Sequence, residues 1–376
     1  MKHIAYVFFC LAALLIFAAP AASESKEELF TEGIQYFEEG DLQNAHKHFN
    51  KAVQLDNTYA AGYFGRGLTR MRIGNTHRAI DDFDKAIELD DEFKEAYNSR
   101  GNAYIRLGQR GKAINDFTKA IEIDEDYLRP YINRGSVYYN RDDFEKAMED
   151  LDYVIEQDTP MVEAYNNRGN LHRKMDNLDK AIADYSSAIE IKPDFGLAYY
   201  NRGISHYEND EPEKALEDFS KGVELRPHAA ENFFMRGKVY LKLGRNQEAI
   251  DDFSEVIEIR PNMAEAFNNR GNAYLANDQY TMARRDFAEA IDLKDEFGDA
   301  YYNRGVVHYY LEDYQKAIDD FDKALSIESN IPSAHYNKGR SRLELSQRNK
   351  ACEHFEYAAN RDHEDARKIK KEVCSD

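Results

Sequence analysis

The sequence predicts an all-α solenoid of antiparallel helix pairs that ends in a C-terminal capping helix. Three observations support this prediction. A unit of 34 residues recurs without insertions, small residues occupy the same two positions of every unit, and large apolar residues recur around them at helical spacing. Because repeats of this kind stack into one elongated domain, the 376 residues are not expected to form separate globules.

The chain begins with a segment typical of a secretory signal peptide. Met1 and Lys2 precede an apolar run, Ile4–Ala19, and small residues follow around Pro20. We therefore expect residues 1–23 to be a signal peptide and the mature protein to be exported, as a periplasmic or secreted protein. The alternative is an uncleaved N-terminal membrane anchor, because the apolar run approaches the length that spans a bilayer. No later stretch is apolar enough, so no membrane span is expected in the mature chain.

Ten repeats then follow one another from Lys26 to Asp365. Phrases such as Tyr97–Gly101 and Tyr131–Gly135, each ending in Arg-Gly, set the spacing of 34 residues. The repeats leave no residues for a separate catalytic domain. Their predicted boundaries are residues 26–59, 60–93, 94–127, 128–161, 162–195, 196–229, 230–263, 264–297, 298–331 and 332–365.

Each repeat is expected to form two helices that approach each other closely. Positions 4, 8 and 11 of the repeat share one helical face, and positions 20, 24 and 27 share another. Position 20 is Ala in all ten repeats, and position 24 is a large apolar or aromatic residue. Gly within a helix costs ~1 kcal/mol relative to Ala, so its recurrence at position 8 indicates a close contact. These glycines are Gly33, Gly67, Gly101, Gly135, Gly169, Gly203, Gly237, Gly271, Gly305 and Gly339.

This pattern resembles the tetratricopeptide repeat (TPR). The shared features are a bulky residue at position 4, small residues at 8, 20 and 27, and aromatic residues at 11 and 24. The resemblance covers all ten repeats and implies a right-handed superhelical α-solenoid that binds other proteins. The sequence departs from the family in two ways. Position 4 is Tyr or Phe in eight repeats where the family often has Trp, and position 7 is Arg in eight repeats where the family usually has Leu.

The unusual arginine at position 7 is always accompanied by an aspartate at position 23. In the first and tenth repeats both are replaced together, which favours an ion pair between the two helices of one repeat. A pairing with the preceding repeat is less favoured because Arg66 would then face His48. The predicted pairs are Arg66–Asp82, Arg100–Asp116, Arg134–Asp150, Arg168–Asp184, Arg202–Asp218, Arg236–Asp252, Arg270–Asp286 and Arg304–Asp320.

Residues 366–376 are expected to form a C-terminal capping helix. Ile369 and Val373 fall at positions 4 and 8 of an eleventh first helix, and four basic residues supply a polar outer side. Cys374 would then lie opposite the start of the helix that carries Cys352. An exported protein can keep a disulfide between these residues, which would add ~3 kcal/mol in the chain-entropy model. The alternative is two unpaired thiols.

The resemblance implies that the first helices line a concave surface through positions 2, 5, 6, 9, 12 and 13. Asn amides both donate and accept hydrogen bonds, and Tyr offers contact area at low entropic cost, as peptide binding requires. The alternative is that Asn at these positions is a general habit of the family. The candidate peptide-binding residues are Asn98, Asn102, Asn133, Asn166, Asn167, Asn170, Tyr200, Asn201, Asn268, Asn269, Asn272, Tyr302 and Asn303.

The charge of the chain excludes one class of partner and favours another. With 50 Lys+Arg against 70 Asp+Glu, the net charge is −20, so no nucleic acid is expected as a partner. Position 2 is mostly acidic, either because carboxylates stabilise helix N-termini or because the groove prefers neutral or basic ligands over acidic ones. These residues are Glu27, Glu95, Glu163, Glu231, Glu265 and Asp299.

No motif in the sequence carries catalytic chemistry. A Gly-rich phosphate loop, a nucleophile elbow, paired zinc-ligand cysteines and a calcium loop are all absent from it. We therefore expect no enzyme activity, no cofactor and no metal. The expected function is a protein–protein interaction scaffold outside the cytoplasm that binds a peptide segment or a partner protein. An oligomerising structural assembly factor of the cell envelope is the alternative, and an enzyme with a site hidden in the solenoid is a remote one.

Overall fold

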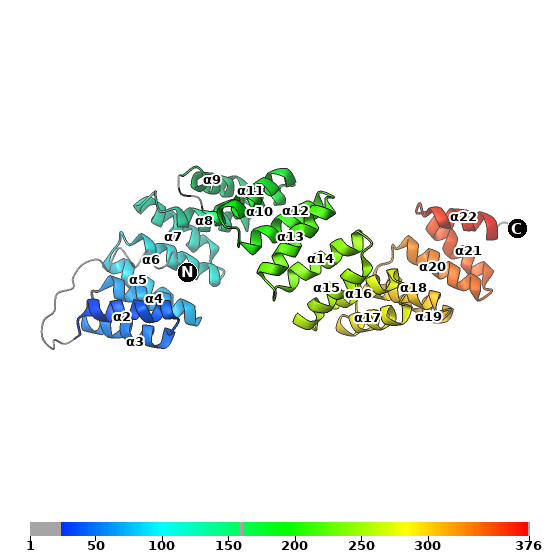
Figure 1. Cartoon of the computed structure of the whole chain (residues 1–376), viewed down its shortest axis with the longest axis horizontal. Helices are drawn as coiled ribbons and strands as arrows, with labels where there is room; N and C mark the ends of the chain where they lie inside the picture. The colour runs from blue at the N-terminus through cyan, green and yellow to red at the C-terminus, as the bar shows by residue number, and fades with distance from the viewer. Residues whose placement is uncertain (1–23, 158, 160, 375–376) are drawn as a thin grey trace. The chain divides into compact units, whose positions relative to one another are not determined.

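The computed structural model describes residues 24–157, 159 and 161–374 (Figure 1). The predicted signal peptide therefore lies outside the described residues. Within the described part of the chain the only regular elements are helices, which make up 79% of it. The fold is an all-α solenoid, as predicted. The chain divides into two compact units, of which the first ends at Met175 and the second begins at Asp176.

The first unit contains nine helices within its described residues. From the first to the fourth repeat, each first helix packs against the second helix of its own repeat, each second helix packs against the first helix of the next repeat, and the last such contact joins the fourth repeat to the first helix of the fifth. The bounds are α2 (Lys26–Glu39), α3 (Leu42–Leu55), α4 (Ala60–Ile73), α5 (Thr76–Leu89), α6 (Lys94–Arg106), α7 (Arg110–Ile123), α8 (Leu128–Tyr139), α9 (Phe144–Ile155) and α10 (Val162–Lys174).

The second unit repeats the same packing from α11 onward. It ends in a single additional helix, which is the predicted cap. The bounds are α11 (Leu178–Ile191), α12 (Gly196–Glu208), α13 (Pro212–Leu225), α14 (Ala230–Lys242), α15 (Asn246–Ile259), α16 (Ala264–Ala276), α17 (Tyr280–Leu293), α18 (Gly298–Tyr310), α19 (Tyr314–Ile327), α20 (Pro332–Glu344), α21 (Arg348–Ala359) and α22 (Glu364–Val373).

The turn between the two helices of a repeat always contains one left-handed residue at position 15. Gly fills this position in four repeats, where the absence of a Cβ removes the steric cost. Asp, which tolerates this conformation better than most residues, fills it in four repeats, and Glu and Ser fill it in one each. The residues are Gly40, Gly74, Gly108, Asp142, Asp176, Asp210, Gly244, Asp278, Glu312 and Ser346.

In the repeats that lie within one unit, the glycine at position 8 packs against the side chain at position 24 of the same repeat, which is an aromatic ring in all but the fourth. A Cβ added to Gly101 would lie 2.5 Å from Cε1 of Phe117, which is too close for two carbon atoms. The fourth repeat has Leu151 in place of the ring, and there the nearest atom to a Cβ on Gly135 is 3.3 Å away. The recurring glycine therefore makes room for the aromatic side chain of the second helix.

The arginine at position 7 forms a bidentate ion pair with the aspartate at position 23. In the seventh repeat, Arg236 donates from Nε to Asp252 Oδ2 at 2.8 Å and from Nη2 to Oδ1 at 2.7 Å. Pairs of this kind join the two helices in the second, third, fourth, sixth, seventh, eighth and ninth repeats. Arg168 belongs to the first unit and Asp184 to the second, so their pairing stays a prediction.

The same arginine also reaches the preceding repeat, which the sequence did not predict. Arg100 donates from Nη1 to Asp84 at 2.6 Å, and Arg134 donates from Nη1 to Thr118 at 2.9 Å. The acceptor is always at position 25 of the preceding repeat. The other such contacts are Arg66–Asn50, Arg168–Asp152, Arg202–Ser186 and Arg270–Ser254.

Burial has a clear effect on the aspartates of these pairs. It raises the pKa of Asp116, Asp150 and Asp252 above the ordinary value, although the neighbouring guanidinium acts to lower it. A buried ion pair of this kind specifies how two helices align more than it adds to stability.

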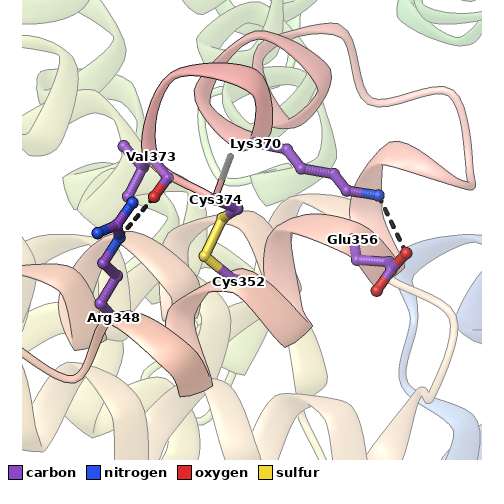
Figure 2. The surroundings of a disulfide bond; sticks show 6 residues. All are labelled: Arg348, Cys352, Glu356, Lys370, Val373 and Cys374. Atoms are coloured by element: carbon purple, nitrogen blue, oxygen red, sulfur yellow. Dashed lines mark hydrogen bonds and ion pairs between the residues drawn. A yellow bond between two sulfur atoms is a disulfide. The ribbon is translucent and has the colours of Figure 1, made fainter. Parts of the chain in front are cut away.

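The tenth repeat and the cap are joined by a disulfide (Figure 2). Cys352 in α21 and Cys374 after α22 are bonded, with 5.7 Å between their Cα atoms. On one side Arg348 Nε donates to the carbonyl oxygen of Val373 at 2.6 Å, and on the other Lys370 pairs with Glu356 at 3.0 Å. The cap buries only Ala366 completely, so covalent and polar contacts account for much of its attachment.

Candidate protein-interaction surface

The first helices present the Asn and Tyr side chains that were predicted to bind a peptide. In the third repeat, α6 carries Asn98 at position 5 and Asn102 at position 9. Asn98 is only 6% exposed, and its Oδ1 accepts a hydrogen bond from Asn133 Nδ2 of the next repeat at 2.8 Å. The eighth and ninth repeats form the same bond, from Asn303 Nδ2 to Asn268 Oδ1 at 3.1 Å.

The position-5 asparagines therefore contribute to packing between repeats. Asn166, at the same position of the fifth repeat, is also buried, and it donates to Asn167 at 3.5 Å. This differs from the expected peptide-contacting role, because a side chain that is almost fully buried offers little surface to a ligand. The sequence could not distinguish these asparagines from exposed ones, since periodicity alone places position 5 on the same helical face as position 9.

The position-9 asparagines are more accessible. Asn102 and Asn272 are half-buried, and no side chain or backbone group among the described residues is hydrogen-bonded to either amide. Asn170 occupies the same position in the fifth repeat. An amide without an internal partner can both donate to and accept from the backbone of a bound peptide.

At position 6, most asparagines already have partners inside the solenoid. Asn167 donates to Ser136 Oγ at 3.0 Å, and Asn269 donates to the backbone oxygen of Glu265 at 2.7 Å. Asn201 lies at the equivalent position in the sixth repeat. These side chains retain accessible surface, because all three are half-buried. These side chains can add contact area for a ligand. Their amides are less available for hydrogen bonds to it, because most of them already have internal partners.

The position-5 tyrosines pack on the phenylalanine of their own repeat. Tyr200 lies 6.0 Å from Phe219 between ring centroids, and Tyr302 lies 5.9 Å from Phe321. Burial raises the pKa of Tyr302, whose hydroxyl also accepts a hydrogen bond from Asn337 at 3.1 Å. These rings consequently form the edge of the core beneath the surface.

Several acidic residues at position 2 are paired with cations of the chain itself. Glu163 lies 3.2 Å from Arg129, and Glu265 lies 3.5 Å from Lys294. Glu231 contacts both Arg226 and Arg260. These pairs neutralise part of the negative charge that the sequence places along the first helices.

Three of the four aromatic rings at position 12 attract basic side chains of the following repeat, which the sequence analysis missed; the fourth, Tyr139, has no Lys or Arg over its ring among the described residues. Arg72 lies over Phe37 at 4.9 Å, and Arg340 lies over Tyr309 at 4.3 Å. Tyr207 is contacted in the same way by Lys238 and Lys242. The signal was present in the sequence as a basic residue at position 9 or 13, one repeat after the ring.

Two further findings concern other kinds of site. Among the residues that the structure describes, no group of three or more His, Cys, Asp or Glu side chains could hold a metal ion. None of the described helices has the length and the apolar composition needed to cross a bilayer.

Family models match most of the repeats. Models described as tetratricopeptide repeat match residues 60–93, 95–127, 162–195, 196–229, 263–296 and 298–331, and a model described as TPR repeat matches residues 33–74 and 237–278. Together these matches cover more than half of the chain. The sequence matches no curated protein.

Solved structures share this architecture. A chain of the APC/C hetero-tetramer Cut9-Hcn1 is 14% identical, with a TM-score of 0.51, and the match covers 93% of this chain and 90% of that one. A tetratricopeptide repeat protein from Parabacteroides merdae ATCC 43184 is 18% identical, covering 66% of this chain and 98% of its own, with a TM-score of 0.47. YrrB, described as a TPR protein with an unusual peptide-binding site, is 27% identical, covering 49% of this chain and 95% of its own, with a TM-score of 0.45.

Proposed function

Because the chain belongs to the tetratricopeptide repeat family, we propose that it is a non-catalytic scaffold that binds an extended peptide segment or a partner protein through its first helices. Proteins of this family are typically interaction scaffolds. The binding face in this proposal is the concave surface that the family forms from these helices. The site of action is outside the cytoplasm, as the signal-peptide pattern of residues 1–23 indicates.

The main support for the proposal is that two position-9 amides are accessible and lack an internal hydrogen-bond partner. Asn102 and Asn272 are half-buried on first helices and have no hydrogen-bond partner among the described residues. Their neighbours Asn98 and Asn268 are buried and bonded to the next repeat. The buried amides hold the first helices in place, and the amides of Asn102 and Asn272 remain available for a ligand. A peptide backbone supplies the donor and acceptor that each free amide can use.

The preferred ligand in this proposal is neutral or basic. The net charge of −20 disfavours an acidic segment at long range, even though several position-2 carboxylates are paired internally.

The test is affinity capture from the envelope fraction of the source organism with the exported chain as bait. The double variant Asn102→Ala/Asn272→Ala should recover the captured partner about tenfold less than the native chain, because two hydrogen bonds to the ligand are lost. The matched control is Asn115→Ala/Asn262→Ala, which removes two amides from exposed positions outside the first helices. Equal recovery by the test variant and the control would reject the groove.

Two accompanying measurements test the remaining parts of the proposal. The N-terminal sequence of the native protein should begin close to residue 24, and a sequence that begins at Met1 would reject cleavage. Light scattering should give a mass that does not change with concentration. A mass that rises with concentration would instead favour an oligomerising assembly factor.

A further inference from the structure

Internal cation–π contacts show that aromatic rings near the ends of the first helices bind basic side chains. Arg340 places its guanidinium carbon 4.3 Å from the centre of the Tyr309 ring and donates from Nη2 to the Tyr309 hydroxyl at 3.0 Å. Phe37 and Tyr207 receive a basic side chain from the following repeat in the same way. Three rings at position 12, distributed over both units, are thus covered by an internal cation.

The next residue, Tyr310, has the same chemistry without an internal cation. It is 51% exposed at the end of α18, which makes it one of the most exposed large apolar side chains among the described residues. Its ring stacks in parallel on Tyr280, with centroids 5.2 Å apart and an angle of 8° between the planes. Tyr309 meets Tyr310 edge-on at 6.0 Å. Among the described residues, no Lys or Arg lies over the Tyr310 ring.

The charges around this tyrosine pair are mainly negative. Asp278 accepts a hydrogen bond from the Tyr280 hydroxyl at 2.8 Å, and Glu312 is exposed in the turn that follows Tyr310. Lys316, a nearby cation, is engaged by Asp313 at 3.0 Å. Arg340 is already placed on Tyr309. An arriving cation would therefore find an exposed ring face and carboxylates close by, whereas an acidic group would be repelled.

We propose that Tyr310, stacked on Tyr280 and flanked by Asp278 and Glu312, binds the guanidinium or ammonium group of a basic residue in the partner segment. The proposal rests on the proposed function, because α18 is one of the first helices that form the proposed binding face. It specifies the partner further: an extended segment with at least one Arg or Lys that reaches the turn between α18 and α19. Tyrosine is also among the residues that most often dominate binding at protein interfaces.

The test uses the full exported chain with its disulfide intact and a fluorescently labelled peptide of alternating Gly and Arg. Peptides of alternating Gly and Glu, and of alternating Gly and Ser, are the charge controls. The Gly-Arg peptide should bind more tightly than both, as measured by fluorescence anisotropy. A Gly-Arg peptide that binds no better than the Gly-Ser peptide would overturn the proposal.

Substitutions at Tyr310 separate the ring from the general acidity of the chain, because none of them changes the net charge. Tyr310→Leu keeps an apolar side chain but removes the ring, and it should weaken Gly-Arg binding about three- to tenfold. Tyr310→Phe keeps the ring and should bind the peptide like the native chain. Circular dichroism checks that both variants are folded. Equal binding by Tyr310→Leu and the native chain would show that the peptide does not use this ring.

The two proposals can fail separately. If Asn102→Ala/Asn272→Ala loses the native partner while Tyr310→Leu keeps full affinity for the Gly-Arg peptide, the groove stands and the cation site is wrong. If Tyr310→Leu loses affinity while the asparagine variant still captures the partner, the cation site stands and the groove is wrong.

Discussion

The interior repeats and the tenth repeat hold their helices together with different polar contacts. In an interior repeat such as the seventh, Arg236 of the first helix is bound by Asp252 of the second. In the tenth repeat these two positions are Lys338 and His354. Among the described residues, Lys338 pairs only with Asp322 of the ninth repeat, and His354 Nδ1 lies 3.2 Å from His335 Nδ1.

The apolar contact, in contrast, is the same in both places. A Cβ on Gly339 of the tenth repeat would lie 2.6 Å from Phe355, much as a Cβ on Gly101 would meet Phe117. Close approach of the two helices therefore does not depend on the Arg–Asp pair. The pair instead fixes alignment within a repeat, and in the tenth repeat a disulfide fixes the outermost helix to its neighbour.

The largest effect should come from breaking an interior pair. Asp252→Ala leaves the guanidinium of Arg236 without its carboxylate in a mostly buried site, which should cost about 3–5 kcal/mol of unfolding free energy. The double variant Arg236→Leu/Asp252→Leu removes both charges and should recover most of that loss. Urea unfolding followed by circular dichroism measures both. A loss below about 1 kcal/mol for Asp252→Ala would mean that the interior pair is dispensable.

A smaller and more local effect should follow loss of the disulfide. Cys352→Ala/Cys374→Ala opens a loop with a sequence separation of 22 residues, which should cost about 3 kcal/mol at the cap. Hydrogen exchange should become faster in α22 and α21 and remain unchanged in α14 and α15, because repeats contact only their neighbours. Unchanged exchange in α22 would show that its polar contacts hold it without the bond.

The smallest effect should be the dependence on pH that His354 contributes in the tenth repeat. Burial, together with Lys338 and His335, lowers the pKa of His354 to about 4. Because the folded pKa lies below the unfolded value of 6.5, the stabilisation is complete above pH 6.5 and is lost as the pH falls through 4. The expected loss is about 1–2 kcal/mol, since one pKa unit corresponds to 1.36 kcal/mol and water screens a partly exposed group.

His354→Asn should reduce this dependence, whereas His77→Asn, at an exposed position, should leave it unchanged. The measurement is the thermal midpoint of the C-terminal transition at pH 7 and pH 4. A midpoint of the native chain that is the same at both pH values would contradict the assignment to His354.

The repeat allowed much of the fold to be predicted, because each position could be compared ten times within one chain. The close helix contact was predicted because Gly recurs at position 8. The Arg–Asp pair was predicted because both residues are lost together in the terminal repeats. The contact from Arg to the preceding repeat could not be predicted in this way. Its acceptors at position 25 include Asn50, Thr118 and Ser186. Each accepts through a side-chain oxygen, but the three are different residue types.

The candidate surface was less predictable because its accessibility depends on how far apart adjacent repeats lie. Asn98 and Asn102 are similar in sequence context, yet only Asn98 comes within hydrogen-bond distance of the next repeat. The distance between adjacent repeats is set by side chains of both repeats together. It therefore cannot be predicted from the residue pattern within one repeat. The same holds for the cations over Phe37 and Tyr309, which come from the repeat that follows the ring.

The third contact of the arginine gives the chain a direction. Arg100 and Arg134 each need an acceptor from the repeat before them and none from the repeat after them. Because the chain is synthesised from its N-terminus, the acceptor is made before the arginine. The helix that carries the acceptor has therefore already been synthesised when each of these arginines is added. Trimming repeats from the C-terminus would leave these two arginines fully bonded, whereas removing the repeat before either of them would leave its Nη1 without an acceptor.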